Sequence, residues 1–154
     1  MNIKKGKTVP RNTKPYKLNS EDQADLQRFM DYLVLHDIAE PSDSSKLYGC
    51  PIFVIKKKNG KPRIIFDVRA YNEVLEDDPC ATLPDIQTAL MHNLKDAKYV
   101  TQIDIKQCFY SLKVSKETMD SGLQNVLTQF GTFILKRAIT GSSRTPAHLS
   151  LIHI

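Results

Sequence analysis

The chain has 154 residues, of which 41% are hydrophobic and 25% charged, and its formal net charge is +5 at pH 7. This composition suits one globular domain with a sizeable core and excludes a disordered chain. The positive balance favours a polyanionic partner. Three widely spaced cysteines without a CxxC pair indicate neither a zinc site nor a disulfide framework, and they are typical of a reducing, intracellular setting. No apolar run reaches membrane-spanning length, and no secretory signal is present.

The N-terminal third contains a basic arm and then a helix. Residues 1–18 carry many cations and two prolines, which predicts an extended or mobile segment. A helix is predicted from about residue 21 to His36, with Ser20 and Gln23 forming a capping box at its start. The apolar face of this helix, which we interpret as its docking face, consists of Leu26, Phe29, Met30 and Leu33.

A hairpin follows, because two strand-like runs flank Asn59-Gly60, the strongest short hairpin signal in a sequence. The runs are Ile52 to Lys56 and Arg63 to Val68. Five cations cluster around the turn: Lys56, Lys57, Lys58, Lys61 and Arg63. They could form a solubilising tip, since edge lysines discourage aggregation. They could instead bind phosphate, since Lys supplies a point charge and Arg can hold two phosphate oxygens.

The next segment contains a second charged pair and a second helix. Asp67 and Arg69 could form a salt bridge or a scaffold for the following loop. Asp77-Asp78-Pro79 is interpreted as a turn rather than a metal site. Pro84 predicts the start of a helix, in which Ile86, Leu90 and Leu94 would form the buried side.

The segment YVTQIDIKQCFYSLKV, residues 99–114, places one carboxylate in a strand-like run. Asp104 lies between Ile103 and Ile105, in a strand predicted from Tyr99 to Ile105. Burial of a bare carboxylate is costly unless a positive group meets it. The residues leave two partners open, a cation such as Lys106 or a metal ion.

The last predicted elements are short. They are a helical turn near Ser115 to Asp120, strands at about Gln124 to Thr128 and Thr132 to Arg137, and a TGSSRTP loop at residues 140–146. Helices and antiparallel strands in this order predict an α+β fold.

Three segments in this order resemble the reverse transcriptase domain of retroviruses and long-terminal-repeat retrotransposons, from about Pro15 to Pro146. CPIFVIKKKNGKPRIIFDVRAYN resembles the fingers hairpin of that family, including its Asp-x-Arg-x-x-Asn at Asp67, Arg69 and Asn72. QIDIKQCFYSLKV resembles the first catalytic motif, an aspartate followed five residues later by an aromatic residue. TGSSRTPA resembles the next motif, a Gly with a Pro five residues later.

The resemblance implies the fingers and a partial palm of a right-hand polymerase, with an antiparallel hairpin and flanking helices. It implies RNA-directed DNA polymerase chemistry on an RNA template and a DNA primer with deoxynucleoside triphosphates, inside the cell, in the cytoplasm or in element particles. Asp104 would be catalytic and would bind Mg²⁺ together with the backbone carbonyl of Ile105, because Mg²⁺ prefers oxygen ligands. The implied nucleotide-binding residues are Lys57 and Arg63 on the triphosphate, Phe109 under the sugar, and Thr140 and Gly141 beside nucleotide and template.

The chain also departs from the family. The paired aspartate expected several dozen residues after Asp104 has no counterpart before Ile154, and Thr140 and His148-Leu149 replace the expected residue types. We therefore predict a basic arm at 1–18, a truncated reverse transcriptase domain at 19–147, and a tail at 148–154 that resembles translated adapter sequence.

Truncation has consequences for activity and for folding. One carboxylate cannot hold two magnesium ions, so the chain alone should be inactive. The helix and hairpin are local and should form alone, whereas the strand at 99–105 should lack neighbours and leave apolar surface exposed. The alternative function is a non-catalytic basic module that binds nucleic acid. A third interpretation is an unrelated α+β domain with a solvated charged surface.

Overall fold

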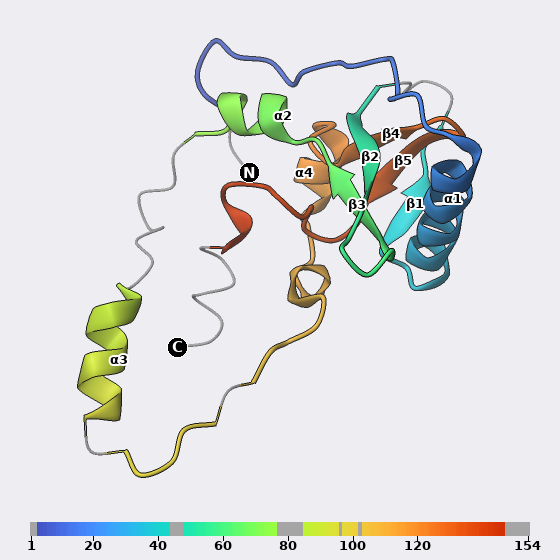
Figure 1. The fold of residues 1–154 in the computed structure, drawn as a ribbon. Helices are drawn as coiled ribbons and strands as arrows, with labels where there is room; N and C mark the ends of the chain where they lie inside the picture. Colours follow the sequence, from blue (N-terminus) through green and yellow to red (C-terminus); the bar gives the residue numbers. More distant parts are fainter. Residues whose placement is uncertain (1–2, 44–47, 77–84, 96, 102, 147–154) are drawn as a thin grey trace.

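The computed structural model describes residues 3–43, 48–76, 85–95, 97–101 and 103–146. Its centre is a five-stranded sheet with the order β1-β5-β4-β2-β3 (Figure 1). Neighbouring strands are antiparallel except β2 and β4, which are parallel. The α+β class predicted from the sequence is therefore confirmed. The strands are β1 (Ala39–Pro41), β2 (Cys50–Lys56), β3 (Pro62–Phe66), β4 (Asn125–Thr128) and β5 (Gly131–Leu135).

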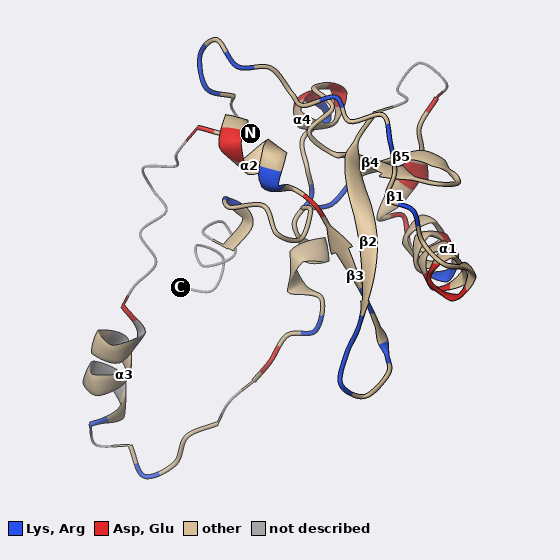
Figure 2. Cartoon of the chain, turned by 45° about the horizontal axis from the view of Figure 1, so that its top comes forward, with Lys and Arg blue, Asp and Glu red and all other residues tan. Residues whose placement is uncertain are grey.

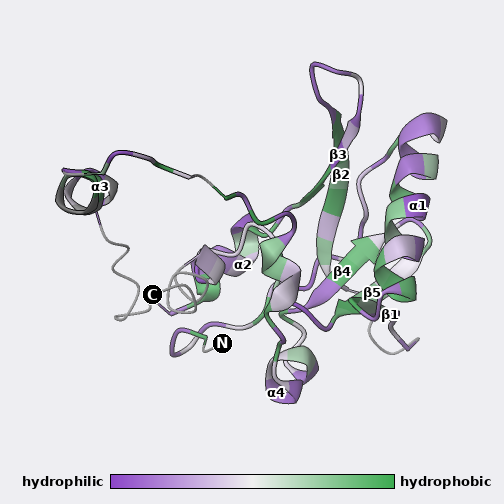
Figure 3. Ribbon diagram, turned by 90° about the horizontal axis from the view of Figure 1, so that it is seen from below, coloured by the Kyte–Doolittle hydropathy of each residue, from purple (hydrophilic) through white to green (hydrophobic). Residues whose placement is uncertain are grey.

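The predicted hairpin is formed by β2 and β3. Lys56 is opposite Pro62 and Ile52 is opposite Phe66, so residues 57–61 make the turn. Gly60 has a φ of 75°, a left-handed conformation that glycine adopts without steric cost. Figure 3 shows hydrophobic residues along the hairpin near the sheet and hydrophilic residues at its tip. The hairpin therefore projects a polar end from an apolar base.

Helix α1 (Ser20–Leu35) supplies much of the core, as predicted. Leu26, Met30 and Leu33 are buried, and the ring of Phe29 lies 6.1 Å from that of Phe66. The predicted capping box at Ser20 is wrong. The cap is Asn19, whose side chain accepts a 2.8 Å hydrogen bond from the Asp22 N–H, because its extended backbone lets it reach this otherwise unpaired donor.

The basic arm, which was predicted to be extended or mobile, contains no helix in its described residues 3–18, and hydrogen bonds tether it to the body. Ile3 forms a β-bridge with Leu75, and the Gly49 N–H donates to the Asn12 carbonyl at 3.0 Å. The Gln129 side chain donates to the Tyr16 carbonyl at 2.9 Å. The apolar arm residues Ile3, Val9 and Leu18 pack against the core.

The predicted strand from Tyr99 to Ile105 is wrong, because none of its described residues belongs to a strand. Tyr99 and Ile103 are 92% and 82% exposed. A strand needs a neighbour for its backbone groups, and the described residues of this segment pair with none of the five strands. The predicted exposure of apolar surface in this segment is confirmed.

Helix α3 (Ile86–Leu94) stands away from the sheet in all three overall views (Figures 1, 2 and 3). Leu90 and Leu94 were expected to be buried, but they are 50% and 37% exposed. Their burial would need a partner surface that the described chain does not offer. Asp85 caps the helix by accepting from the Thr88 N–H. Pro84, the Asp77-Asp78-Pro79 turn and the 148–154 tail lie outside the described residues.

Three short helices complete the described chain. They are α2 (Arg69–Val74), the 3₁₀ helix η1 (Cys108–Ser111) and α4 (Lys116–Asp120). The Ser115 side chain caps α4, which confirms the predicted helical turn. No helix in the described part of the chain is long and apolar enough to cross a membrane.

Candidate nucleic-acid interface

The tip of the β2–β3 hairpin concentrates positive charge (Figure 2). Four of its cations are exposed: Lys57, Lys58, Lys61 and Arg63. None of the four forms an ion pair with a described carboxylate. The Lys57 N–H donates to the Lys61 carbonyl at 2.9 Å, which closes the turn. The four cations are therefore exposed to solvent around a hydrogen-bonded turn, where a polyanion can reach them.

Below the tip, Asp67 organises a cluster of three side chains. Its two oxygens accept from Arg69 Nε at 2.8 Å and Arg69 Nη2 at 2.7 Å. The Tyr16 hydroxyl also donates to Asp67 Oδ2, at 2.7 Å. The salt bridge considered from the sequence is thus formed, and it is bidentate. Tyr16 was not expected here, because it lies 51 residues away in the chain.

These contacts fix the ionisation of the cluster. Hydrogen bonds from Arg69 and then Tyr16 hold the pKa of Asp67 well below its usual range, despite partial burial. The hydrogen bond to Asp67 raises the pKa of Tyr16. The Arg69 side chain is 82% exposed although its guanidinium is held. Arg69 is therefore an oriented cation with donors left for a ligand.

A pocket of about 620 Å³ lies beside this cluster, between the arm and the start of α2. Its cations are Arg11 and Lys14 from the arm and Arg69 from α2, and its acids are Asp67 and Glu73. This pocket was not predicted from the sequence, because the arm and α2 are far apart in the chain. The cations Arg11 and Lys14 of the arm therefore line this pocket.

Asn72 joins the end of the hairpin motif to the 140–146 loop. Its side-chain amide donates to the Gly141 carbonyl at 3.1 Å, and its side-chain oxygen accepts from the Ser143 N–H at 3.0 Å. Gly141 has a φ of 95°, and an added Cβ there would lie 3.2 Å from Val68 Cγ2. The structure thus brings together two segments that sequence reasoning assigned to one site. Thr140 is exposed beside this contact.

The structure does not bring Asp104 to this surface. Asp104 and Ile105 are exposed, and no described residue forms an ion pair with Asp104, so the pairing with Lys106 is absent. Its exposure removes the desolvation cost that made its position between isoleucines awkward. Phe109 is half-buried in η1. No hydrogen bond or ion pair among the described residues links Asp104 to Lys57 or Arg63.

The described residues supply few oxygen donors for a magnesium centre. Two-ion chemistry needs several carboxylates around the metals. Within the described ranges, no three His, Cys, Asp or Glu side chains form a group that could hold a metal ion. The described residues therefore do not fit a two-magnesium site, and Asp104 with the Ile105 carbonyl supplies at most part of one.

Comparison with known proteins shows that the chain is similar in sequence to parts of retroviral polyproteins. It is 38% identical over 78 residues to the Gag-Pro-Pol polyprotein of Sheep pulmonary adenomatosis virus. It is 31% identical over 112 residues to the Pol polyprotein of Caprine arthritis encephalitis virus. The chain is related to retroviral Pol polyproteins. The matches cover 51% and 71% of this chain but only 4% and 10% of those polyproteins. No protein-family model matches.

Comparison with solved structures shows which proteins have a fold similar to that of this Pol-related chain. The foamy viral protease-reverse transcriptase in complex with an RNA/DNA hybrid matches with a TM-score of 0.77 at 20% identity. The same foamy viral enzyme in complex with double-stranded DNA matches with a TM-score of 0.70 at 19% identity. Both matches cover 99% of this chain, and they cover 20% and 29% of the foamy viral chains. The Pol-related chain therefore shares its fold with part of a protease-reverse transcriptase.

Proposed function

We propose that the chain is the fingers and the beginning of the palm of an RNA-directed DNA polymerase of the reverse transcriptase type. The observation that carries the proposal is the cationic tip of the β2–β3 hairpin, which forms no ion pair with a described carboxylate and whose motif is bound through Asn72 to the Gly141 loop. A hairpin with unpaired cations on a fixed base suits the binding of phosphate groups. The relation to Pol polyproteins and the protease-reverse transcriptase fold support the same function.

In this proposal the two hairpin cations Lys57 and Arg63 hold the phosphates of an incoming deoxynucleoside triphosphate. Thr140 and Gly141 lie beside the nucleotide, and Phe109 lies under its sugar. An RNA template and a DNA primer bind along the cationic surface. Asp104 and the Ile105 carbonyl contribute to Mg²⁺ binding only when further carboxylates join them.

A second candidate function is a non-catalytic module that binds nucleic acid. It is favoured by one observation, that no group of carboxylates among the described residues could hold a metal ion. Both functions predict electrostatic binding of nucleic acid. Only the polymerase proposal predicts a triphosphate site at Lys57 and Arg63 that depends on a primer-template.

The experiment measures binding of the chain to a labelled RNA/DNA hybrid by fluorescence anisotropy across a salt series. It then measures photocrosslinking of a labelled deoxynucleoside triphosphate with and without that hybrid. Lys57→Ala and Arg63→Ala are compared with Lys116→Ala, a cation on α4. Counterion release predicts that each hairpin variant lowers the salt slope by about one unit, whereas Lys116→Ala leaves it unchanged.

The crosslinking result separates the two functions. Hybrid-dependent crosslinking that both hairpin variants abolish supports the polymerase proposal. Salt-dependent hybrid binding with no hybrid-dependent triphosphate crosslinking supports the binding module instead. Equal binding at low and high salt contradicts the electrostatic account on which both functions rest, and no binding at low salt leaves only a solvated charged surface.

A further inference from the structure

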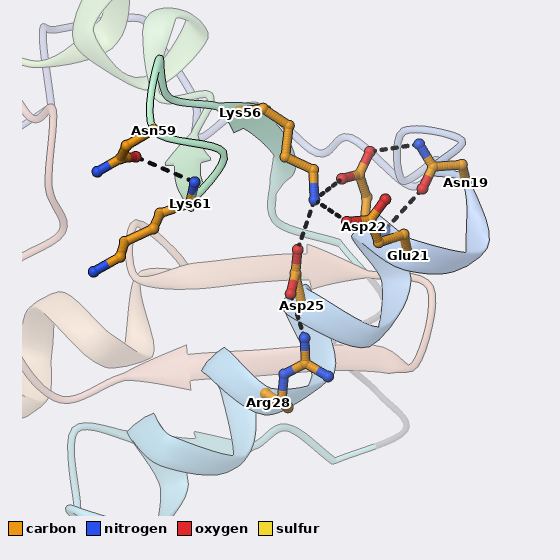
Figure 4. A network of polar contacts seen from close by, with 8 residues as sticks. All are labelled: Asn19, Glu21, Asp22, Asp25, Arg28, Lys56, Asn59 and Lys61. Carbon is orange, nitrogen blue, oxygen red and sulfur yellow. Dashed lines mark hydrogen bonds and ion pairs between the residues drawn. The ribbon is translucent and has the colours of Figure 1, made fainter.

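Lys56 differs from the other four cations of the hairpin, because it faces helix α1. Its Nζ lies 2.7 Å from Glu21 Oε1, 3.0 Å from Asp25 Oδ2 and 3.6 Å from Asp22 Oδ1 (Figure 4). Its side chain is 36% exposed. The cation is therefore surrounded by three carboxylates of one helix.

The acidic side chains around Lys56 need a positive partner and stabilise its charged form. The Asp25 side chain is only 8% exposed, and it also forms an ion pair with Arg28 (Figure 4). A carboxylate that is shielded from water needs a positive partner. The hydrogen bond from Lys56 is the main cause that lowers the pKa of Asp25, and the bonds to Glu21 and Asp25 raise the pKa of Lys56. Both groups thus stay charged around neutral pH.

Strand register explains why neighbouring lysines differ. Val54 and Ile64 are opposite each other, and both pack against the core, so they mark the hairpin face that meets α1. Side chains alternate along a strand, so Lys56 shares the face of Val54. Lys57 begins the turn, and Arg63 is opposite Ile55 on the other face. Lys56 therefore adds a polar contact with α1 on the same face of the hairpin that makes the apolar contact.

We infer that Lys56 is a positioning residue that locks the hairpin against α1 and so fixes where Lys57 and Arg63 meet phosphate groups. Its own charge is used by α1 and does not neutralise a phosphate. No other polar contact joins α1 to β2 or β3 in the described chain. That the hairpin binds phosphate groups rests on the proposed function, whereas the contact between Lys56 and α1 does not.

The experiment compares Lys56→Met with Lys56→Arg and with Lys58→Met, a neighbouring cation that makes no ion pair with a described carboxylate. The first measurement is hydrogen exchange of the hairpin amides without nucleic acid. We expect faster exchange in Lys56→Met, recovery in Lys56→Arg and no change in Lys58→Met, because only Lys56 bonds to α1. Unchanged exchange in Lys56→Met overturns the inference whether or not the chain binds nucleic acid.

The second measurement is the salt dependence of binding to the RNA/DNA hybrid. We expect Lys56→Met to weaken binding by up to about tenfold with an unchanged salt slope, because a loose hairpin must be ordered on binding. Lys58→Met should lower the slope by about one unit. A slope lowered by Lys56→Met as much as by Lys58→Met makes Lys56 a direct phosphate ligand and overturns the inference. Without any hybrid binding by the wild type the proposed function fails, and hydrogen exchange alone decides the role of Lys56.

Discussion

Asn72 and Gly141 lie 69 residues apart in the chain, and the side-chain amide of Asn72 donates to the Gly141 carbonyl at 3.1 Å. The same side chain accepts from the Ser143 N–H at 3.0 Å. One amide thus satisfies a donor and an acceptor of a loop that has little regular structure of its own. The contact determines where the loop lies relative to the hairpin.

Asn72→Ala should therefore release the loop. Loss of two hydrogen bonds should lower the free energy of unfolding by about 1–2 kcal/mol. The Ser143 amide should exchange faster with solvent. Urea denaturation and hydrogen exchange measure the two effects, with Gln27→Ala on α1 as the control. Unchanged Ser143 exchange would show that other contacts hold the loop.

Gly49→Ala should destabilise the junction of β2 and β4. An added Cβ would lie 2.8 Å from backbone atoms of Asn125 and Val126, which cannot rotate away. Overpacking of this kind costs about 1–3 kcal/mol. Thermal unfolding measures the loss. Gly60→Asn is the matched control, because Gly60 meets nothing within 4 Å and Asn tolerates a left-handed conformation. Equal losses in both variants would contradict the packing argument.

Asp67 should make stability depend on acid pH. Its pKa is lower in the folded protein than in the unfolded chain, chiefly because Arg69 donates to it. Its stabilising contribution is therefore fully present above about pH 4, the ordinary range of Asp, and is lost as the pH falls further. Urea unfolding of wild type and Asp67→Asn should give a stability difference that is constant near neutral pH and shrinks below about pH 4. A difference that grows on acidification would reverse this assignment.

Primer extension should be undetectable with the 154-residue chain alone. Asp104 is exposed, and the described residues bring no carboxylate cluster to it. Two magnesium ions need more oxygen ligands than this. Incubation with an RNA template, DNA primer, Mg²⁺ and deoxynucleotides tests the point. Template-dependent product that disappears in Asp104→Ala would show that the chain assembles a complete site.

Hydrogen exchange should divide the chain into two parts. Amides of the hairpin should be protected, whereas those from 97 to 107 should exchange quickly, because none of the described residues of this segment pairs with a strand. Ile103→Ser should raise solubility without loss of stability, since Ile103 is 82% exposed. Ile52→Ser should unfold the chain, since Ile52 is 2% exposed. Strong protection around Asp104 would mean that the segment has found a partner.

The elements with local signals could be predicted from the sequence alone. Helical spacing from Leu26 to Leu33 predicted α1, and Asn59-Gly60 predicted the hairpin turn. The α4 turn at Ser115 was also readable. Each of these elements closes only a short loop, so near neighbours in the chain supply most of what it needs.

The surroundings of the charged residues, by contrast, depend on the tertiary fold and could not be predicted. Sequence reasoning grouped Lys56 with Lys57 as equal cations, yet α1 pairs with the first and leaves the second in solvent. Strand-like spacing around Asp104 predicted a strand that the structure lacks, because a strand forms only where another backbone accepts its hydrogen bonds. Pairing, burial and ionisation depend on groups that are distant in the chain, and local sequence does not encode which of them meet.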